Sequence, residues 1–394
     1  MKKFISGFMI LFLTMIVSLS ANAAPGDLFV QLDLEDPLVG NDQCSILKVM
    51  PDGIFSEFVS FPTILALTGL DDCDMDDTGI AVARSGDVYF SEDQSDSVIK
   101  ATPAGALSTF VTEAQIIAVT LEGSANLSNG MVIGPDGGLC FNDRISNSIL
   151  KATIPGGVVS LVVSEAQIQA VTGFPIVNLE GGIAFDCAGN LYFTDNPETE
   201  GGDFQDNILV LTPQGDLSIF VSEQEINAAT GFNSTDLDTG MTFFGDSLYV
   251  NDDGACDCVL KITLDGEISV LVSEAQITAA TDNGGADLEG GIALNQRAQV
   301  FIGDDGSNPD DSNLLMSTFN GSSVSLFITT QEFDDFFPGF DKPRLEGSIA
   351  FEGVDACIVT DIPTLSEWGL IAMAGILGIA GFIVIVIRRR KVTA

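Results

Sequence analysis

The sequence contains no histidine among its 394 residues. This absence excludes Ser-His-Asp and Cys-His catalytic systems, and it excludes the common zinc sites that use histidine ligands. Positive charge is also scarce, because 15 Lys and Arg residues face 56 Asp and Glu residues, which gives a formal net charge of −41. Such an acidic surface repels nucleic acids and anionic lipids and attracts cations. The same acidity could serve solubility alone, and both interpretations stay open at this point.

The two ends of the chain both indicate export. Residues 1–23 contain two lysines, an apolar stretch and the small-residue site Ala21-Asn22-Ala23, which is the pattern of a cleavable secretory signal peptide. Residues 369–387 are uncharged and mostly apolar, long enough to form a transmembrane helix. The basic tail, residues 388–394, is expected to stay cytoplasmic by the positive-inside rule, which leaves the preceding residues outside.

Residues 358–368 form a linker that carries a short motif before the apolar segment. The motif reads Ile362-Pro363-Thr364-Leu365-Ser366-Glu367-Trp368-Gly369. With the apolar segment and the arginine-rich tail, it resembles the IPTL-type C-terminal sorting signal of Gram-negative bacteria. The resemblance implies an inner-membrane intermediate, recognition by an exosortase-type membrane peptidase, and delivery to the cell surface or extracellular matrix. A simple C-terminal membrane anchor is the alternative.

Seven cysteines can form disulfides in an exported protein, because exported compartments are oxidising. They are Cys44, Cys73, Cys140, Cys187, Cys256, Cys258 and Cys357. The odd number leaves at least one cysteine without a partner in the same chain. Cys256 and Cys258 are separated by one residue, so they are predicted not to form a common structural bridge with each other. The spacing does not determine the other pairs.

Residues 24–357 contain a repeat in which each copy opens on a glycine followed by a short apolar segment. The opening glycines are Gly79, Gly130, Gly182, Gly240 and Gly291, and a final copy opens on Ser348. Each copy holds four short apolar segments separated by turn residues, a spacing typical of consecutive antiparallel strands. Four strands repeated six times predict an all-β fold, a six-bladed β-propeller.

The sixth copy is divided between the two ends of this region. Its first strand, residues 348–351, has no further strand after it, whereas Leu28–Val30, Ser45–Lys48 and Phe55–Ser60 have no first strand before them. We therefore expect one C-terminal strand and three N-terminal strands to form a common sheet and close the ring. Closure also protects sheet edges that would otherwise promote aggregation.

A Ser/Thr-x-x-Gln/Glu pattern follows the fourth strand in four copies. This pattern is a helix capping box, in which the two side chains satisfy free backbone amides at the start of a helix. The boxes begin at Thr112, Ser164, Ser222 and Ser273. We expect a short helix in each of these connections between blades, packed on neighbouring blades through residues such as Ile168 and Val171.

Two segments resemble the blades of known propellers. Asn129 to Asp143 is similar to the NGxxxxPDGxLYxxD blade opening, and Gly189 to Asp195 is similar to the GNLYVxD run. These patterns occur in the six-bladed NHL-repeat and senescence-marker-protein/gluconolactonase families. In the gluconolactonase-like family, a Glu from an E-G-P sequence and an Asn from an N-G sequence hold a catalytic divalent metal. By this resemblance Glu180, Glu289 and Glu346 match the Glu-Gly part and Asn129 the Asn-Gly part, although no proline follows in this chain.

The first strand of a propeller blade lines the central channel, so the residue two positions before each opening should lie at one mouth of that channel. These residues are Asp77, Ser128, Glu180, Asp238, Glu289 and Glu346. Carboxylates on the order of 10 Å apart repel by roughly 0.4 to 1.7 kcal/mol per pair, which a divalent cation would relieve. With Asn129 they form a candidate metal site, and hard oxygen ligands without histidine favour Ca²⁺. Alternatively, each carboxylate caps its own turn and faces water.

A second acidic set follows the second strands of the blades. It comprises Asp93, Asp143, Asp195, Asp252, Asp253, Asp304 and Asp305. An Asp at this position stabilises the following turn in NHL-type blades, so most of these residues are predicted to be structural.

These features predict an exported, surface-sorted propeller that acts as a noncatalytic binding or matrix module, with Ca²⁺ as a stabilising ion. The repeat pattern is kept in all copies, whereas enzymes usually break it in one or two blades. The alternative is a Ca²⁺-dependent, lactonase-like hydrolase whose metal at the channel mouth polarises the substrate. A third hypothesis is a structural coat component without a small ligand.

Overall fold

The computed structural model describes residues 26–35, 42–197, 205–282, 284–306, 312–338, 340–352 and 357. Residues 1–356 form one compact unit and residues 357–394 form a second. The predicted signal peptide, sorting motif, transmembrane helix and basic tail lie outside the described residues. Within the described ranges, no helix has the length and apolar character needed to cross a membrane.

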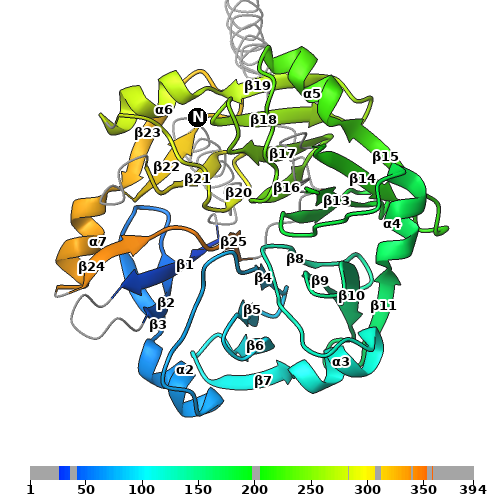
Figure 1. Ribbon diagram of the computed structural model, residues 1–394. Helices are drawn as coiled ribbons and strands as arrows, with labels where there is room; N and C mark the ends of the chain where they lie inside the picture. Colours follow the sequence, from blue (N-terminus) through cyan, green and yellow to red (C-terminus); the bar gives the residue numbers. More distant parts are fainter. Residues whose placement is uncertain are drawn as a thin grey trace, which may run out of the picture. The chain divides into compact units, whose positions relative to one another are not determined.

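Six antiparallel sheets are arranged in a ring around one axis, which confirms the predicted six-bladed propeller (Figure 1). Blade 2 comprises β4 (Ile80–Val82), β5 (Val88–Glu92), β6 (Ser97–Ala101) and β7 (Leu107–Val111), and blade 3 comprises β8 (Met131–Ile133), β9 (Leu139–Asp143), β10 (Ser148–Ala152) and β11 (Val159–Val163). Blade 4 comprises β12 (Ile183–Phe185), β13 (Leu191–Asp195), β14 (Asn207–Leu211) and β15 (Leu217–Ser222), and blade 5 comprises β16 (Met241–Phe244), β17 (Ser247–Asp252), β18 (Cys258–Thr263) and β19 (Ile268–Val272). Blade 6 comprises β20 (Ile292–Leu294), β21 (Val300–Asp304), β22 (Asn313–Ser317) and β23 (Val324–Ile328).

Blade 1 joins the two ends of the propeller sequence, as predicted. It comprises β1 (Leu28–Glu35), β2 (Asp42–Val49), β3 (Phe55–Val59) and, from the C-terminal side, β25 (Ile349–Phe351). In the pairing of β1 with β25, Val30 lies opposite Ile349 and Phe29 opposite Ala350. The innermost strands of adjacent blades contact one another all the way round, including β25 with both β4 and β20. The ring is therefore closed by non-covalent strand pairing.

The closing sheet also contains a strand that the sequence pattern does not predict. Strand β24 (Asp341–Arg344) pairs with the second half of β1, which is longer than the expected Leu28–Val30 segment. Asp33 lies opposite Arg344 in this pairing. Arg344 is thereby fixed beside the loop that leads into β25.

The repeated glycines are explained by the close approach of neighbouring innermost strands. A Cβ atom at Gly182 would lie 2.2 Å from the backbone nitrogen of Met241, and one at Gly291 would lie 2.5 Å from the backbone nitrogen of Ile349. Both distances are too short for any side chain. The backbone N–H of Gly182 also donates to the carbonyl of Thr239 across the blade boundary, at 2.6 Å.

The hydrophobic core consists of six clusters, each shared by two neighbouring blades. In the cluster between blades 3 and 4, Ile149 and Phe193 are fully buried. The helix residue Ile168 is buried in the same cluster and Val171 packs against it, as predicted. Blades are thus held together mainly by apolar contacts between sheets.

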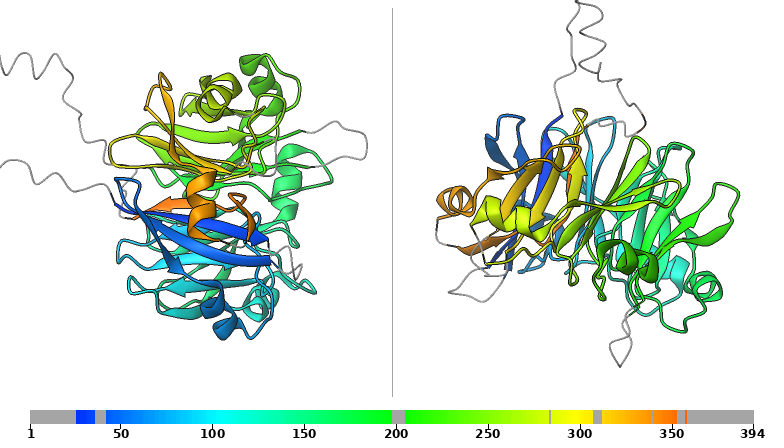
Figure 2. Two further views of the ribbon diagram at one scale, coloured as in Figure 1. Left: turned by 90° about the vertical axis from the view of Figure 1, so that its left-hand side faces the viewer. Right: turned by 90° about the horizontal axis from the view of Figure 1, so that it is seen from above.

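In the part of the chain that the structure describes, six short helices lie on the periphery of the ring (Figures 1 and 2). The four predicted ones are α3 (Glu113–Thr120), α4 (Glu165–Thr172), α5 (Glu223–Thr230) and α6 (Glu274–Thr281), each with its capping box formed. Two were not predicted, α2 (Phe61–Thr68) and α7 (Thr330–Phe336). Helix α7 has a capping box between Thr329 and Glu332, whereas α2 begins with a proline in its first turn.

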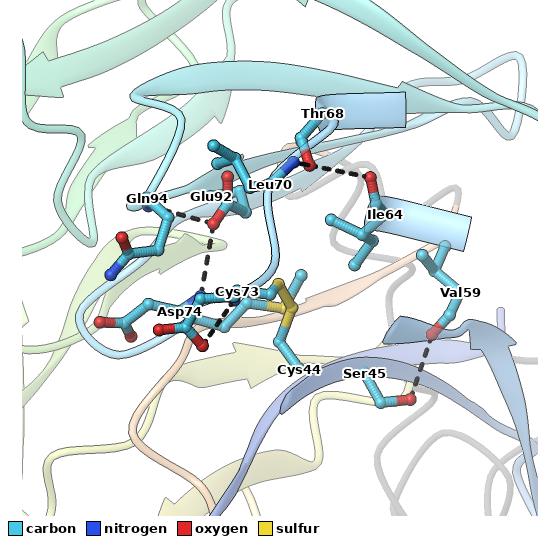
Figure 3. Close-up of a disulfide and its surroundings, with 12 residues drawn as sticks. Cys44, Ser45, Val59, Ile64, Thr68, Leu70, Cys73, Asp74, Glu92 and Gln94 are labelled. Carbon is cyan, nitrogen blue, oxygen red and sulfur yellow. Dashed lines mark hydrogen bonds between the residues drawn. A yellow bond between two sulfur atoms is a disulfide. The ribbon is translucent and has the colours of Figure 1, made fainter. Parts of the chain in front are cut away.

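Disulfides connect parts of the propeller that lie close together. Cys44 of β2 pairs with Cys73 in the loop before β4, which links blades 1 and 2 (Figure 3). The prediction against a Cys256–Cys258 bridge is wrong, because Asp257 adopts a left-handed φ of 40° and the two Cα atoms lie 5.1 Å apart. Cys187 and Cys357 are also disulfide-bonded. Cys140 is the buried free thiol among the described cysteines, in agreement with the odd number.

Candidate functional site

The loops before the first strands and the loops after the second strands lie at the same end of the propeller axis. The backbone N–H of the residue after the second strand donates to a carbonyl of the loop that leads into the first strand of the same blade. This contact occurs in five blades, from Asp93 to Asp74, Arg144 to Asn126, Asn196 to Asn178, Asp253 to Asp236, and Asp305 to Asp287, at 2.8 to 3.1 Å. The two sets of loops therefore form one layer.

Carboxylates at the ends of the second strands hold these loops in place. Four of them accept a backbone N–H at 2.9 to 3.0 Å, namely Asp143 from Asn126, Asp195 from Asn178, Asp252 from Asp236, and Asp304 from Asp287. This agrees with their predicted structural role. In blade 2 the same contact is made by Glu92, which accepts from the N–H groups of Asp74 and Gln94 (Figure 3). Asp93 instead accepts from the Asn126 side chain at 2.8 Å.

Three of the predicted site residues meet at the axis, although they belong to three different blades. The Asn129 side-chain nitrogen donates to Asp77 Oδ1 at 3.4 Å and to the backbone carbonyl of Asp238 at 3.1 Å. Asn129 is buried, and its Oδ1 accepts from the Ser348 hydroxyl at 3.4 Å. We refer to Asp77, Asn129, Asp238 and Glu289 as the axial cluster.

The carboxylates of the axial cluster interact electrostatically with one another. Burial raises the pKa of Asp238 to about 8, and the charges of Asp236, Asp77 and Glu289 add to the effect. Burial, Asp287 and Asp77 raise the pKa of Glu289 to about 7. Burial and Asp76 also raise the pKa of Asp77, against the influence of Arg144 and Asn129. Asp238 Oδ1 is buried and has no hydrogen-bond partner among the described residues.

Glu289 also belongs to two groups of carboxylates at the side of the axis. Its ligand oxygen lies within 4.8 Å of those of Asp305 and Glu346, and in a second group within 4.8 Å of those of Asp253 and Asp287. Glu346 contacts the guanidinium of Arg344, which also lies 3.7 Å from Asp76. Burial and Asp76 raise the pKa of Glu346, and Arg344 opposes this shift. Glu346 thus already has a cationic partner.

Glu180 is separated from the axial cluster by its own partners. One carboxylate oxygen contacts the Arg144 guanidinium, and the other accepts from the Asn178 side chain at 2.7 Å. Ser128, the equivalent residue of blade 3, donates to the Leu179 carbonyl at 2.6 Å. The structure therefore brings Asp77 and Asn129 into contact, and Asp238 reaches Asn129 through its backbone carbonyl. Glu289 interacts electrostatically with Asp77 and Asp238 and lies beside Glu346, whereas Glu180 is held by other partners.

Sequence reasoning did not include Arg144, Arg344, Asp76 and Asp287 in the site. Asp287 lies two residues before Glu289, a spacing that points both side chains the same way in an extended segment, so the signal was present. The two arginines had no comparable signal, because they come from a loop after β9 and from the unpredicted strand β24. Asp253 and Asp305 were recognised as acidic loop residues, in a set of which most members were predicted to be structural.

Comparison with known proteins identifies the C-terminal segment. Residues 362–391 match the IPTL-CTERM motif. The chain carries an IPTL-CTERM tail. This confirms the resemblance drawn from the Ile362–Gly369 segment, although the IPTL-CTERM match covers only the end of the chain. The comparison with curated proteins found no match.

The propeller is similar to several solved structures. It matches a chain of a nidogen/laminin complex with a TM-score of 0.50 and 15% sequence identity, over 82% of this chain and 98% of the other. It also matches a virginiamycin B lyase from Staphylococcus aureus with a TM-score of 0.45 and 17% sequence identity, over 76% of this chain and 87% of the other. A gluconolactonase from Xanthomonas campestris matches with a TM-score of 0.48 and 12% sequence identity, over 74% of this chain and 86% of the other. At such identities the likeness shows the shared fold alone.

Proposed function

We propose that the chain is an exported, surface-sorted propeller that acts as a noncatalytic binding or matrix module and binds Ca²⁺ at the axial cluster. The observation that carries this proposal is the meeting of Asp77, Asn129 and Asp238 at the axis. These residues come from blades 2, 3 and 5, and Asp238 Oδ1 is buried there without a hydrogen-bond partner among the described residues. A buried, unpaired carboxylate oxygen is costly, and a bound cation would satisfy it.

The ligand chemistry of the axial cluster favours Ca²⁺. Its side chains offer carboxylate and amide oxygens, which are the ligands that Ca²⁺ takes in sets of six to eight, with backbone carbonyls and waters completing the shell. The raised pKa values of Asp238 and Glu289, about 8 and about 7, mean that these groups hold protons near neutral pH in the absence of metal. A cation would replace those protons.

The IPTL-CTERM tail supports the proposed destination. Residues 1–23 would act as the signal peptide, 24–357 as the propeller, 358–368 as the linker, 369–387 as the membrane helix and 388–394 as the cytoplasmic tail. An exosortase-type peptidase would recognise the Ile362–Gly369 segment and release the propeller to the cell surface or matrix. The large negative charge makes nucleic acid an unsuitable partner.

The contacts of Glu180 and Glu346 weigh against two of the three metal-ligand pairs that the lactonase-like hydrolase could use. By the family resemblance, Glu180, Glu289 or Glu346 would hold one metal together with Asn129. Both oxygens of Glu180 are engaged by Arg144 and Asn178, and Glu346 contacts Arg344. Glu289 is the remaining candidate of the three, so the hydrolase stays the alternative that an activity assay has to test.

Calorimetric titration of the purified protein with Ca²⁺ tests this proposal. We expect one saturable site, with affinity at least tenfold weaker in Asp238→Asn, because the substitution removes one anionic ligand. Asp265→Asn, in an exposed turn, should bind like the unchanged protein. The affinity should also fall as the pH decreases from 8 to 6, since protons then compete for Asp238 and Glu289.

Two outcomes would contradict the proposal. Equal Ca²⁺ affinity in Asp238→Asn and Asp265→Asn would remove the axial cluster as the site. Chelator-sensitive hydrolysis of a panel of lactones, lost in Asn129→Ala, would show that the hydrolase hypothesis is correct instead.

A further inference from the structure

We propose that reduction of the Cys256–Cys258 disulfide creates a binding site for a thiophilic divalent cation such as Zn²⁺, formed by the two cysteine thiolates and the carboxylate of Asp252. This site lies in the hairpin between β17 and β18 and is separate from the axial cluster. It does not depend on the proposed binding of Ca²⁺.

The hairpin holds the three ligand groups together. Asp252 is the last residue of β17 and Cys258 the first residue of β18, and the two are direct partners in the strand pairing. Cys256 lies in the loop between them. A carboxylate oxygen of Asp252 and both sulfur atoms all lie within 4.8 Å of one another. No large rearrangement is needed to bring them to a common ion.

Asp252 has one carboxylate oxygen available for a ligand. Its Oδ1 accepts from the N–H groups of Asp236 and Gly254, at 3.0 and 3.1 Å. Its Oδ2 is buried and has no hydrogen-bond partner among the residues that the structure describes, and the residue as a whole is only 1% exposed. Asp195 and Asp304, at the equivalent positions of blades 4 and 6, also have an unpartnered Oδ2, so the available oxygen is a feature of the blade. Among these three residues, Asp252 is the one whose carboxylate lies beside two sulfur atoms.

The surroundings of the hairpin favour a cation over an anion. The strongest charged neighbours of Asp252 are the carboxylates of Asp236 and Glu223, and those of Asp257 are Glu274 and Asp287. Two thiolates would add to this negative charge. Binding a divalent ion would reduce the repulsion that reduction creates.

The oxidation state of Cys256 and Cys258 determines which metal ion the site favours. In the disulfide, the sulfur atoms carry no thiolate charge and are poor ligands. An external dithiol supplies two electrons and two protons and becomes a disulfide, whereas a phosphine supplies two electrons and becomes a phosphine oxide, with its oxygen atom and the two protons taken from water. Either reaction breaks the S–S bond and leaves two thiols. Zn²⁺ then displaces both thiol protons and coordinates the two sulfur atoms and Asp252, with water as a fourth ligand. Thiolate ligands select Zn²⁺ over Ca²⁺.

Zinc binding requires the two sulfur atoms to separate after reduction. Zn–S and Zn–O distances of about 2.3 and 2.0 Å place tetrahedral ligands roughly 3.5 to 3.8 Å apart, so the sulfur atoms, which are bonded to each other in the disulfide, move apart while the Asp252 oxygen stays beside them. Ala255 is exposed and Gly254 is half-buried, whereas Cys256 is only 4% exposed. Because Cys256 and Cys258 are both buried, a reductant reaches the disulfide when the loop at Gly254 and Ala255 opens.

Titration with Co²⁺, a spectroscopic substitute for zinc, tests the proposal on the full purified chain with Ca²⁺ in excess. After treatment with a phosphine, we expect one equivalent of Co²⁺ to bind with thiolate-to-cobalt charge-transfer absorption, and Zn²⁺ to abolish the signal. The oxidised protein should show no such absorption. Asp252→Asn keeps the Oδ1 acceptor and should retain the absorption with affinity at least tenfold weaker.

Cys256→Ser/Cys258→Ser is the matched control, since the reductant also reaches the other disulfides. The proposal predicts that this double variant loses the absorption. Absorption that persists in it would come from other cysteines and would overturn the proposal, as would unchanged affinity in Asp252→Asn. If a variant does not fold, the site is tested instead by measuring how fast Cys256 and Cys258 are alkylated in the reduced, unsubstituted protein. Zinc should protect Cys256 and Cys258 from alkylation, and equal labelling with and without zinc would contradict the site.

Discussion

Replacing Asp206 by Asn is expected to increase the free energy of unfolding of the metal-free protein, relative to the unchanged protein, by an amount that grows as the pH rises. Asp206 is fully buried, and its Oδ2 accepts from the N–H of Leu237 at 2.8 Å. Burial, with the negative charges of Asp236, Glu223 and Asp238, raises its pKa from the ordinary 3.8 to about 9. The folded state therefore binds a proton that the unfolded chain has already lost between these two values.

The sign of the effect follows from this difference in bound protons. Between pH 4 and pH 9 the folded state holds more protons at Asp206 than the unfolded state does, so each increase in pH lowers the free energy of unfolding. One group can contribute up to about 1.4 kcal/mol per pH unit. Asn carries no titratable proton, and this dependence disappears in the variant.

Urea unfolding in the presence of a chelator measures the difference. We expect the free energy of unfolding of Asp206→Asn, relative to the unchanged protein, to increase by about 2 to 4 kcal/mol between pH 5 and pH 8. Asp216→Asn, in the exposed turn between β14 and β15, should show no such increase. A relative stability of Asp206→Asn that is independent of pH would show that the carboxyl group is not held protonated.

Replacing Ile349 by Asp is expected to open the ring at its closing sheet. Ile349 is 5% exposed, pairs with Val30 and belongs to the cluster between blades 6 and 1. The substitution removes an apolar side chain from that cluster and introduces a charge without a partner. We expect a loss of about 3 to 5 kcal/mol in the free energy of unfolding.

Ile219→Asp is the matched control, because it makes the same chemical change on the outer strand β15, where the side chain is 38% exposed. It should cost less than about 1 kcal/mol. Hydrogen exchange locates the effect, since the amides of β1 and β25 should exchange faster in Ile349→Asp before those of blades 3 and 4 do. Equal effects of the two substitutions would contradict non-covalent closure by β25.

The repeat pattern predicted the ring because it specifies each blade locally. The placement of Phe29 and Ile349 in one sheet follows from a divided sixth copy, and helices α3 to α6 follow from their capping boxes. Strand β24 could not be predicted, since it contains Pro343 and forms only because β1 extends to meet it. The Cys256–Cys258 bridge was missed because it depends on a left-handed Asp257, which the spacing alone does not reveal.

The sequence predicted where the candidate site lies, but it did not predict which side chains contact one another there. Counting two residues back from each opening glycine identified Asp77, Asp238 and Glu289 at the axis. Which carboxylates face one another depends on side-chain direction and on loops of other blades. Glu180 illustrates this, because Arg144 of the preceding blade engages it and removes it from the group.

Anomalous diffraction from crystals soaked in a lanthanide that substitutes for Ca²⁺ tests the central claim most directly. We predict a strong peak at the axis, within bonding distance of the carboxylates of Asp77 and Asp238, which CaCl₂ in excess removes. A peak confined to exposed acidic turns, or none at the axis, would contradict a cation site in the axial cluster.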